Sequence, residues 1–218
     1  MAKIGVIIGR FQPFHQGHAY LVQCALDANM DKILFLCGSS NRARSFKNHK
    51  AYTRLAQEQQ FLLDYKKSWS TSPYPPIFVT ADALVCCQEH ILLIKRGNHP
   101  GQGLYALPGG FIEATELVQT AVVRELQEET TIALDSKELL AALEGIKVYD
   151  YPSRSQIGRV ITHVGRFQLQ NPDPVAVKAN DDAQEALWYP CEQIAKIAHK
   201  MHDDHFLIIQ DQLSWYKN

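Results

Sequence analysis

The sequence contains no long apolar run and no excess of basic charge. Its apolar stretches fall well short of the roughly 20 residues that a membrane-spanning helix needs, and its start lacks the pattern of a secretory signal. With 22 Lys and Arg against 23 Asp and Glu, the net charge is −1, which gives no bulk attraction to nucleic acid or to an anionic membrane. We therefore expect a cytoplasmic protein with no nucleic-acid or membrane partner.

Cysteine is also scarce. The five cysteines, at positions 24, 37, 86, 87 and 191, are odd in number and form no CxxC pair. This argues against a disulfide scaffold and against a zinc site, and it fits a reduced cytosolic protein. The length of 218 residues and the 46% apolar composition allow a buried core in one large domain, or in one domain plus a fragment.

The most informative stretch is residues 107–132, LPGGFIEATELVQTAVVRELQEETTI. Its helical part places Glu125, Glu128 and Glu129 at i, i+3 and i+4, so that three carboxylates project from one face. These charges repel one another, and the helix dipole disfavours anions near a C-terminus by roughly 0.3–1 kcal/mol each. A solvated acidic face is one interpretation. The other is a bound Mg²⁺ or Mn²⁺, because such ions prefer hard oxygen ligands.

The residues around this cluster favour the metal. Gly110 is followed after five residues by Glu116, after seven more by RELQEE at 124–129, and then by Ile132. This pattern resembles the Nudix box, G-x5-E-x7-R-E-U-x-E-E-x-G-U with U aliphatic, and it departs only at Thr131, where the family has glycine. The resemblance implies a Nudix fold that cleaves a nucleoside diphosphate linked to another group X. It also implies a divalent metal that activates the attacking water.

The resemblance further implies roles for the charged residues of the box. Glu125 and Glu129 would be metal ligands, and Glu128 would be a ligand or the general base. Glu116 would be an outer ligand that reaches the metal through water, and Arg124 would orient a neighbouring glutamate.

The uncharged residues of the box have implied roles as well. Gly110 would belong to the metal site and Gly109 to the substrate-binding residues, while Leu126 and Ile132 would pack the helix on the sheet. The glycine that is missing at Thr131 usually supplies the left-handed residue that ends the helix. A non-glycine residue there costs roughly 1–2 kcal/mol, unless the helix ends in another way. The departure therefore leaves the geometry of the helix exit open, whereas we expect the metal ligands to be retained.

The N-terminal part predicts a separate α/β fragment. Aliphatic runs at residues 3–8 and 32–37 flank a helical pattern at 19–28, which indicates a βαβ unit. A helix is predicted at 50–69, and the Pro-rich segment that follows it, SPYPP at 72–76, breaks the helix. We place a domain boundary there, which gives domains 1–72 and 73–218.

A second motif lies in the fragment. The string GRFQPFHQGH, residues 9–18, places His15 and His18 near a helix N-terminus, where phosphate anions are favoured. Together with GSSNRARSFKN at 38–48, it resembles the N-terminal half of nicotinamide mononucleotide (NMN) adenylyltransferases that are fused to Nudix domains. The resemblance implies that both histidines contact ATP phosphates. It also implies that the nucleotide site is lined by Gly9, Arg10 and Phe11.

The fragment departs from that family in its length. The family domain carries a second phosphate-binding motif, I-S-x-T-x-x-R, and nothing between residue 49 and the next domain supplies it. We expect a truncated Rossmann-like nucleotidyltransferase fragment that has lost adenylyl transfer. Because a sheet of two strands is marginal alone, the fragment should pack against the second domain or a second copy of the chain, which leaves a homodimer open.

The second domain predicts a Nudix α/β/α sandwich, with a mixed sheet between helices. Two strands joined by only three residues, at 77–87 and 91–95, should be antiparallel, because so short a connection cannot cross over. The other predicted elements are strands at 142–149, 158–169 and 186–189 and helices at 190–199 and 206–217.

The substrate must be inferred from outside the box. Arg96 and Arg159 lie at strand ends and could bind a phosphate or a nucleotide, although most arginines at such positions are solvated. The strings at 99–111, 158–163 and 180–190 resemble the Nudix half of the same fusions, which is associated with ADP-ribose. The resemblance therefore favours a small-molecule nucleotide substrate, ADP-ribose, cleaved to AMP and ribose 5-phosphate.

Several features leave alternatives open. For the stretch HDDH at 202–205, a helix N-cap with solvated flanks is favoured over a metal site. For Asp181-Asp182, a turn is favoured over a catalytic base. Two other functions are possible, a nucleotidyltransferase and a non-hydrolysing nucleotide sensor. The complete set of glutamates favours the hydrolase over the sensor. Aromatic residues that could stack on adenine or lie in the core are Tyr105, Phe111, Tyr149 and Trp188.

Overall fold

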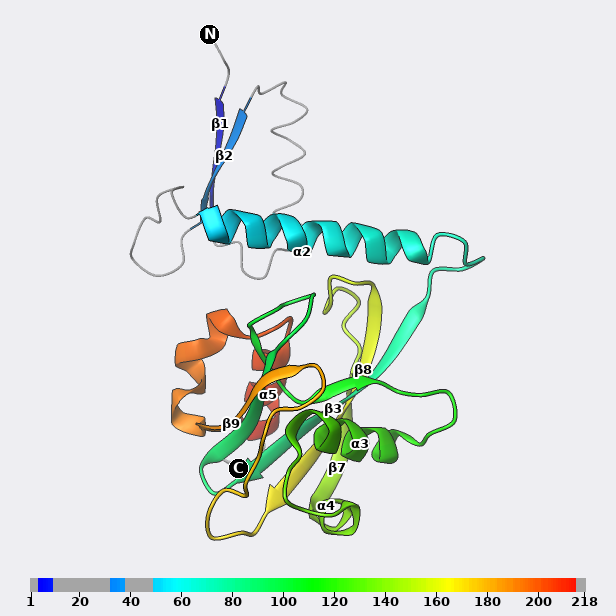
Figure 1. Cartoon of the computed structure of the whole chain (residues 1–218), viewed down its shortest axis with the longest axis vertical. Coiled ribbons are helices and arrows are strands. Elements are labelled where there is room, and N and C mark those ends of the chain that lie inside the picture. Colours follow the sequence, from blue (N-terminus) through cyan, green and yellow to red (C-terminus); the bar gives the residue numbers. More distant parts are fainter. Residues whose placement is uncertain (1–3, 10–31, 38–48, 215–218) are drawn as a thin grey trace. The chain divides into compact units, whose positions relative to one another are not determined.

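The computed structural model describes residues 4–9, 32–37 and 49–214 (Figure 1). The chain divides into two compact units, Met1–Ala56 and Gln57–Asn218. The first unit contains the two predicted strands, β1 (Ile4–Gly9) and β2 (Lys32–Cys37), and they pair in parallel, as a βαβ connection requires.

Most of the N-terminal nucleotide motif cannot be placed. Gly9 is the last residue of β1. The helix predicted at 19–28 and the motif residues Arg10, Phe11, His15 and His18 lie outside the described residues.

The helix α2 (His49–Ser68) crosses the division between the units, so its second half, from Gln57, belongs with the C-terminal unit. It lies within one residue, at each end, of the helix predicted at 50–69. The domain boundary predicted between 72 and 73 stays a prediction.

The C-terminal unit is built on a mixed seven-stranded sheet with the order β5-β4-β3-β8-β7, to which β6 adds through β3 and β9 through β4. The central strands β3 and β8 are parallel, and the other pairs are antiparallel, including the predicted hairpin of β3 and β4. The strands are β3 (Ile77–Cys87), β4 (His90–Arg96), β5 (Tyr105–Ala106), β6 (Gly109–Phe111), β7 (Leu143–Tyr149), β8 (Arg159–Leu169) and β9 (Ala183–Pro190).

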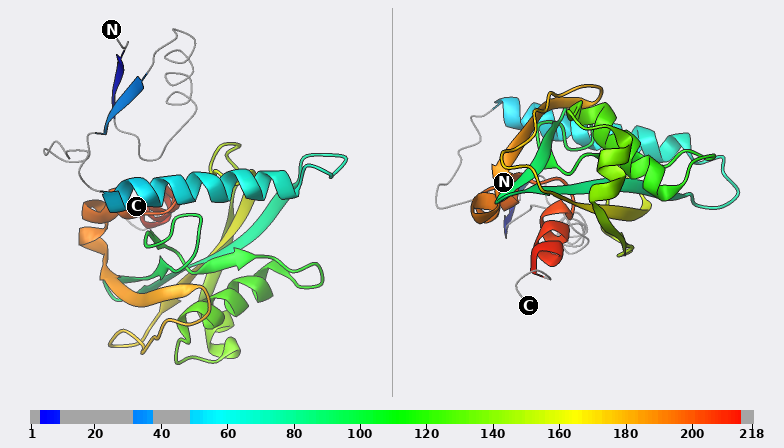
Figure 2. Two further views of the ribbon diagram at one scale, coloured as in Figure 1. Left: turned by 45° about the horizontal axis from the view of Figure 1, so that its top comes forward. Right: turned by 90° about the horizontal axis from the view of Figure 1, so that it is seen from below.

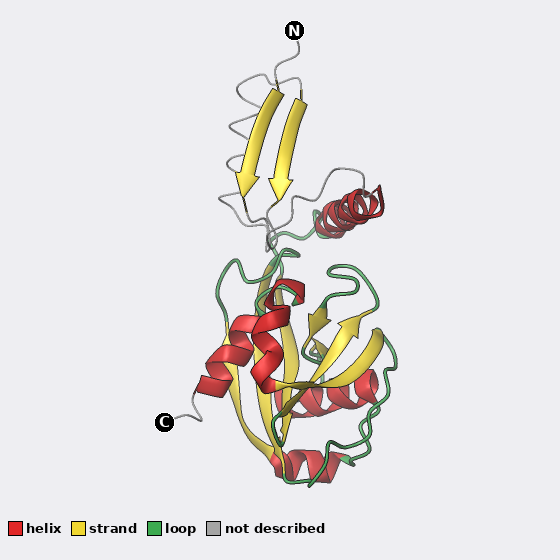
Figure 3. Cartoon of the chain, turned by 90° about the vertical axis from the view of Figure 1, so that its left-hand side faces the viewer, coloured by secondary structure: helices red, strands yellow, loops and turns green. Residues whose placement is uncertain are grey.

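Helices cover both faces of this sheet, so the predicted α/β/α sandwich is confirmed. Alternate residues of β3 point to opposite faces. Ala83 and Val85 belong to a buried cluster with α3 (Val118–Thr130) and α4 (Ser136–Ala142). Leu84 and Cys86 belong to a second cluster with η1 (Cys191–Lys200) and α5 (His205–Ser214). The right panel of Figure 2, and Figure 3, show the two helical layers on either side of the sheet.

The structure adds elements that the sequence reasoning missed. The helix α4 begins at a capping box, in which Asp135 accepts hydrogen bonds from the backbone of Lys137 and Glu138 while Glu138 accepts one from the Asp135 N–H. Seven residues are too few to show a helical period, so this D-x-x-E signature was the usable signal. The strands β5 and β6, of two and three residues, are too short to show a strand pattern and were also missed. No helix within the described residues is long and apolar enough to cross a membrane.

Thr131, which stands where the family has glycine, adopts the left-handed conformation that ends the helix. Its φ is 38° and its ψ is 41°, and its N–H donates to Gln127 O to end α3. Its hydroxyl donates to Lys178 O at 2.8 Å, from an exposed position. The helix exit is therefore the usual one, with a backbone cost of roughly 1–2 kcal/mol that this hydrogen bond, about 0.5–1.5 kcal/mol, offsets in part.

We predict that Thr131→Val lowers the free energy of unfolding by about 1 kcal/mol, because valine keeps the backbone penalty and loses the hydroxyl. Thr131→Gly should stay within about 1 kcal/mol of the wild type, since relief of the left-handed penalty offsets the lost hydrogen bond and the added flexibility of the unfolded chain. Thermal unfolding of both variants beside the wild type measures this. A valine variant as stable as the wild type would contradict the assigned role of the hydroxyl.

Candidate functional site

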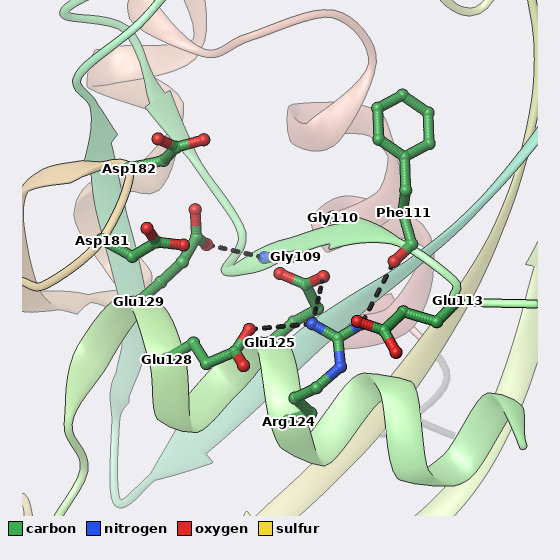
Figure 4. Close-up of a pocket in the computed structure, with 10 residues that line it drawn as sticks. All are labelled: Gly109, Gly110, Phe111, Glu113, Arg124, Glu125, Glu128, Glu129, Asp181 and Asp182. Atoms are coloured by element: carbon green, nitrogen blue, oxygen red, sulfur yellow. Dashed lines mark hydrogen bonds and ion pairs between the residues drawn. The ribbon is translucent and has the colours of Figure 1, made fainter. Parts of the chain in front are cut away.

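A pocket of about 340 Å³ lies between the two glycines of strand β6, the acidic face of α3 and the turn at Asp181-Asp182 (Figure 4). Most of its side chains are acidic: six carboxylates and a single guanidinium line it. The lining residues are Gly109, Gly110, Phe111, Glu113, Arg124, Glu125, Glu128, Glu129, Asp181 and Asp182.

The helix α3 presents these acids because its opposite face is apolar. Ala121, Val122 and Leu126 are fully buried in the core, and Ile132 just beyond the helix joins the same cluster. The predicted packing of Leu126 and Ile132 on the sheet is therefore confirmed. Burial of this stripe fixes the rotation of the helix, so the glutamates face the glycines of β6.

Glu125 and Glu129 are the two buried acids of the site. They are 9% and 4% exposed, and Glu129 accepts a hydrogen bond from the Gly109 N–H at 2.8 Å. A Cβ on Gly110 would come within 2.6 Å of the Glu125 carboxylate, so a side chain there would displace that carboxylate. Burial raises the pKa of Glu125, and burial with the neighbouring Glu125 charge raises the pKa of Glu129 to about 8. The protein alone therefore disfavours the charged form of both groups.

Arg124 connects the other acids. Its Nη1 donates to Glu125 and to Glu128, both at 2.8 Å, and its Nη2 donates to the carbonyl of Phe111 at 3.1 Å. It binds Glu116 through two hydrogen bonds, at 2.6 and 3.0 Å, which lower the pKa of that carboxyl. This is the geometry that an orienting role requires. Glu116 itself does not line the pocket; it contacts Arg124, which does.

The carboxylate oxygens of the α3 glutamates are the ligand type that a divalent cation such as Mg²⁺ or Mn²⁺ prefers. Glu125, Glu128 and Glu129 each use one oxygen in a contact with Arg124 or Gly109, and within the described residues the second oxygen of each has no hydrogen-bond partner. A cation near these oxygens would reverse the penalties that burial and like charge impose on them. As the side chains lie, no three His, Cys, Asp or Glu groups in the described ranges are already arranged around a common metal position.

The turn at Asp181-Asp182 is held against α3 by a segment that we call the strap, residues 176–182. The N–H of Asn180 donates to Glu129 O and its side chain to Glu128 O, both at 3.1 Å. Asp181 takes a left-handed φ of 51°. The predicted turn is confirmed, and the structure adds that this turn places both carboxylates in the pocket.

The sequence reasoning missed two acids near the pocket: Glu113 lines it, and Asp82 is buried next to it in β3. Asp82 is only 6% exposed, pairs with Gly109 in the sheet, and accepts a hydrogen bond from the Thr162 hydroxyl. Burial raises the pKa of its carboxyl. A single aspartate within the apolar run IFVTADALVCC was the available signal.

The two candidate substrate arginines do not line the pocket. Arg96 donates from Nε to Pro100 O at 2.8 Å, and Arg159, the first residue of β8, donates to Asp150 O and lies 3.9 Å from its carboxylate. Their contacts with substrate stay predictions.

Only one of the four aromatic candidates faces the site. Phe111 lines the pocket and is 49% exposed. Trp188 donates to Val175 O at 2.7 Å beside the core, Tyr149 donates to Asp211, and the Tyr105 ring packs against a neighbouring tyrosine. The Phe111 ring also packs against the Phe78 ring, with 5.8 Å between the ring centroids, and its stacking on an adenine stays a prediction.

The helix start predicted at residues 202–205 is confirmed, because α5 begins at His205 and Asp204 O accepts the Ile208 N–H, but the predicted solvated flanks were wrong. His202 and His205 are 9% and 7% exposed, and Asp204 forms two hydrogen bonds with the buried Arg154. His205 accepts from the Leu107 N–H at 3.0 Å, and burial lowers its pKa to about 3. The side chains turn inward because Arg154 and the Leu107 amide supply partners that the local sequence does not reveal.

Comparison with known proteins agrees with this site. Residues 77–211 match the NUDIX domain family. An ADP-ribose pyrophosphatase of Methanocaldococcus jannaschii is 39% identical over 137 residues, which are 63% of this chain and 73% of that protein. An ADPR-responsive transcriptional repressor, NtrR, of Acinetobacter baylyi is 34% identical over 94 residues, 42% of this chain and only 38% of the repressor.

A solved structure resembles the chain over nearly its whole length. The bifunctional NMN adenylyltransferase/ADP ribose pyrophosphatase of Francisella tularensis, complexed with AMP and a Mn ion, is 27% identical, with a TM-score of 0.75 and coverage of 98% of this chain and 99% of that one. Both this structure and the archaeal relative carry ADP-ribose pyrophosphatase in their descriptions. The chain therefore belongs to the Nudix family and is a homologue of its ADP-ribose pyrophosphatases.

Proposed function

We propose that the C-terminal unit hydrolyses ADP-ribose to AMP and ribose 5-phosphate with the help of Mg²⁺ or Mn²⁺. The observation that carries the proposal is the charge of the pocket, in which six carboxylates face one guanidinium. An anionic diphosphate would be repelled from such a lining. Divalent cations remove that repulsion, and the relatives described as ADP-ribose pyrophosphatases, one of them with a Mn ion, point to the same chemistry.

The residues that would hold the cation are Glu125 and Glu129, with Glu128 beside them. When bound, a divalent ion lowers the pKa of a coordinated water from about 15.7 toward neutrality and offsets phosphate charge. The chain's own contribution is placement. Gly110 leaves room for the Glu125 carboxylate, the Gly109 N–H holds Glu129, and the Arg124 guanidinium holds one oxygen each of Glu125 and Glu128.

The role of general base is proposed for Glu128. Its side chain is 47% exposed, whereas Glu125 and Glu129 are buried, so Glu128 is the glutamate of the cluster that bulk water reaches most easily. A group that must exchange protons with solvent in each turnover needs that access.

A non-hydrolysing sensor is the second candidate, because the Acinetobacter baylyi relative is a repressor that responds to ADPR. A sensor needs the pocket and has no need for the full set Glu116, Glu125, Glu128 and Glu129. Turnover distinguishes the two. The purified chain with Mg²⁺ is offered ADP-ribose, NADH, diadenosine polyphosphates, and NMN with ATP, and the products are identified by mass. AMP and ribose 5-phosphate support the hydrolase, whereas bound and unchanged ADP-ribose supports the sensor.

We predict that Glu129→Gln lowers kcat for ADP-ribose by orders of magnitude, since it removes a charged oxygen from the proposed metal site. The variant should unfold at a temperature close to that of the wild type, because an amide can still accept the Gly109 hydrogen bond. Glu89→Gln, an exposed acid in the β3–β4 turn, is the matched control and should leave kcat unchanged. Near-native turnover by Glu129→Gln would remove this residue from the metal site.

We predict that His18→Ala leaves ADP-ribose hydrolysis unchanged, because the adenylyltransferase-like motif belongs to the other unit of the chain. Steady-state kinetics with ADP-ribose and Mg²⁺ measures this, and an assay with NMN and ATP on the wild type shows whether any adenylyl transfer exists to be lost. A parallel loss of hydrolysis in His18→Ala would show that the two motifs serve one reaction.

A further inference from the structure

An acid on α2 reaches the C-terminal unit from outside the segment that matches the Nudix family. Glu58 precedes that segment by 19 residues, since the match begins at Ile77. One oxygen of its carboxylate accepts the Gly101 N–H at 2.7 Å, and the other contacts Nδ1 of His99. The side chains of Glu58 and His99 are each 21% exposed, and the ring of Phe61, one turn further along α2, lies 6.0 Å from the His99 ring.

Both of these contacts are made to a glycine-rich loop, residues 97–103. Within the loop the hydrogen bonds are mostly local, such as Gln102 Nε2 to Gly97 O and Leu104 N to Gly101 O. The loop is also tied to β4, because Arg96 donates from Nε to Pro100 O and accepts the Gly103 N–H at its carbonyl. Glu58 adds a charged acceptor from a separate helix.

The same loop holds the pocket turn at its other end. The Asn98 side chain donates to Asp182 Oδ1 at 2.8 Å, and the Gly97 N–H donates to Asp182 O at 2.7 Å. The approach is so close that a Cβ on Gly97 would lie 2.6 Å from that carbonyl. Asp182 is thus held by α3 through the strap on one side and by this loop on the other.

We propose that Glu58 is a positioning residue of the hydrolase site, which acts through the loop at 97–103 and Asn98 to hold Asp182 in the pocket. The inference rests on the proposed function for its kinetic consequence only. The turn faces the glutamates of α3, so its position sets the width of the pocket and the place of two carboxylates. Misplacement of a site group by about 1 Å can cost up to about 100-fold in rate. The helix α2 is then part of the hydrolase although it precedes the matched segment.

The proposal is tested first by kinetics on the full chain. Glu58→Ala should lower kcat/KM for ADP-ribose by about tenfold, and Glu58→Gln, which still accepts the Gly101 N–H, should lose less. Asp64→Asn is the matched control, because Asp64 lies on the exposed part of the same helix and its hydrogen bonds are with Gln60. It should leave both kcat and KM unchanged.

A double-mutant cycle with Asn98→Ala then separates positioning from general stabilisation. If Glu58 acts through Asn98, Glu58→Ala should cost less than about twofold in the Asn98→Ala background, since contacting groups in one network are not additive. Full additivity of the two effects, or an unchanged kcat/KM in Glu58→Ala, overturns the proposal.

Hydrogen exchange gives a readout that does not depend on activity. In Glu58→Ala, and also in Glu58→Gln should the alanine variant fail to fold, amides of residues 97–103 and 180–183 should exchange faster, while those of α3 stay protected. Faster exchange confined to the loop, or in neither segment, contradicts the proposal. If the wild type does not hydrolyse ADP-ribose, the proposed function fails while this measurement still decides the role of Glu58.

Discussion

The crowding of carboxylates against the two glycines of β6 is the constraint on which the site depends. Glu125 occupies the space that a side chain on residue 110 would need, and Glu129 takes the N–H of Gly109. Both glycines belong to β6, which is fixed in register on β3, with Gly110 opposite Ala81 and Gly109 opposite Asp82. The distance between these glycines and the acids is therefore set by the sheet and by the buried face of α3. This arrangement costs free energy in the protein alone, because burial and like charge raise the pKa values of the acids, and a cation reverses that cost.

The departure from the Nudix box at Thr131 fits the same arrangement. Thr131 keeps the left-handed conformation and adds a hydroxyl that donates to Lys178 O. Lys178 lies in the strap, whose N–H groups at Lys178 and Asn180 donate to the last carbonyls of α3, those of Thr130 and Glu129. The residue that replaces glycine therefore ties the end of α3 to the segment that carries the acidic turn. A strained backbone position contributes in this way to the shape of the pocket.

The sequence predicted the parts of this molecule that depend on local pattern. Short apolar runs predicted β3, β4 and β8, and the spacing of the box predicted α3 with its acids on one face. What it could not give are contacts between residues far apart in the chain. Asp182 meets Asn98 across 84 residues, and His205 meets Leu107 across 98. Such partners decide whether a polar side chain is buried or solvated. For this reason the burial of the HDDH side chains, the role of Asp82 and the contacts of Glu58 with the loop at 97–103 were not predicted.

Binding of Mn²⁺ to the full chain, followed by the electron paramagnetic resonance signal of the free ion, tests the central claim most directly. If the buried glutamates of α3 hold the cation, the wild-type chain removes Mn²⁺ from solution. A chain that carries both Glu125→Gln and Glu129→Gln should then leave the signal at its protein-free intensity. Equal Mn²⁺ binding by the two chains would contradict the account.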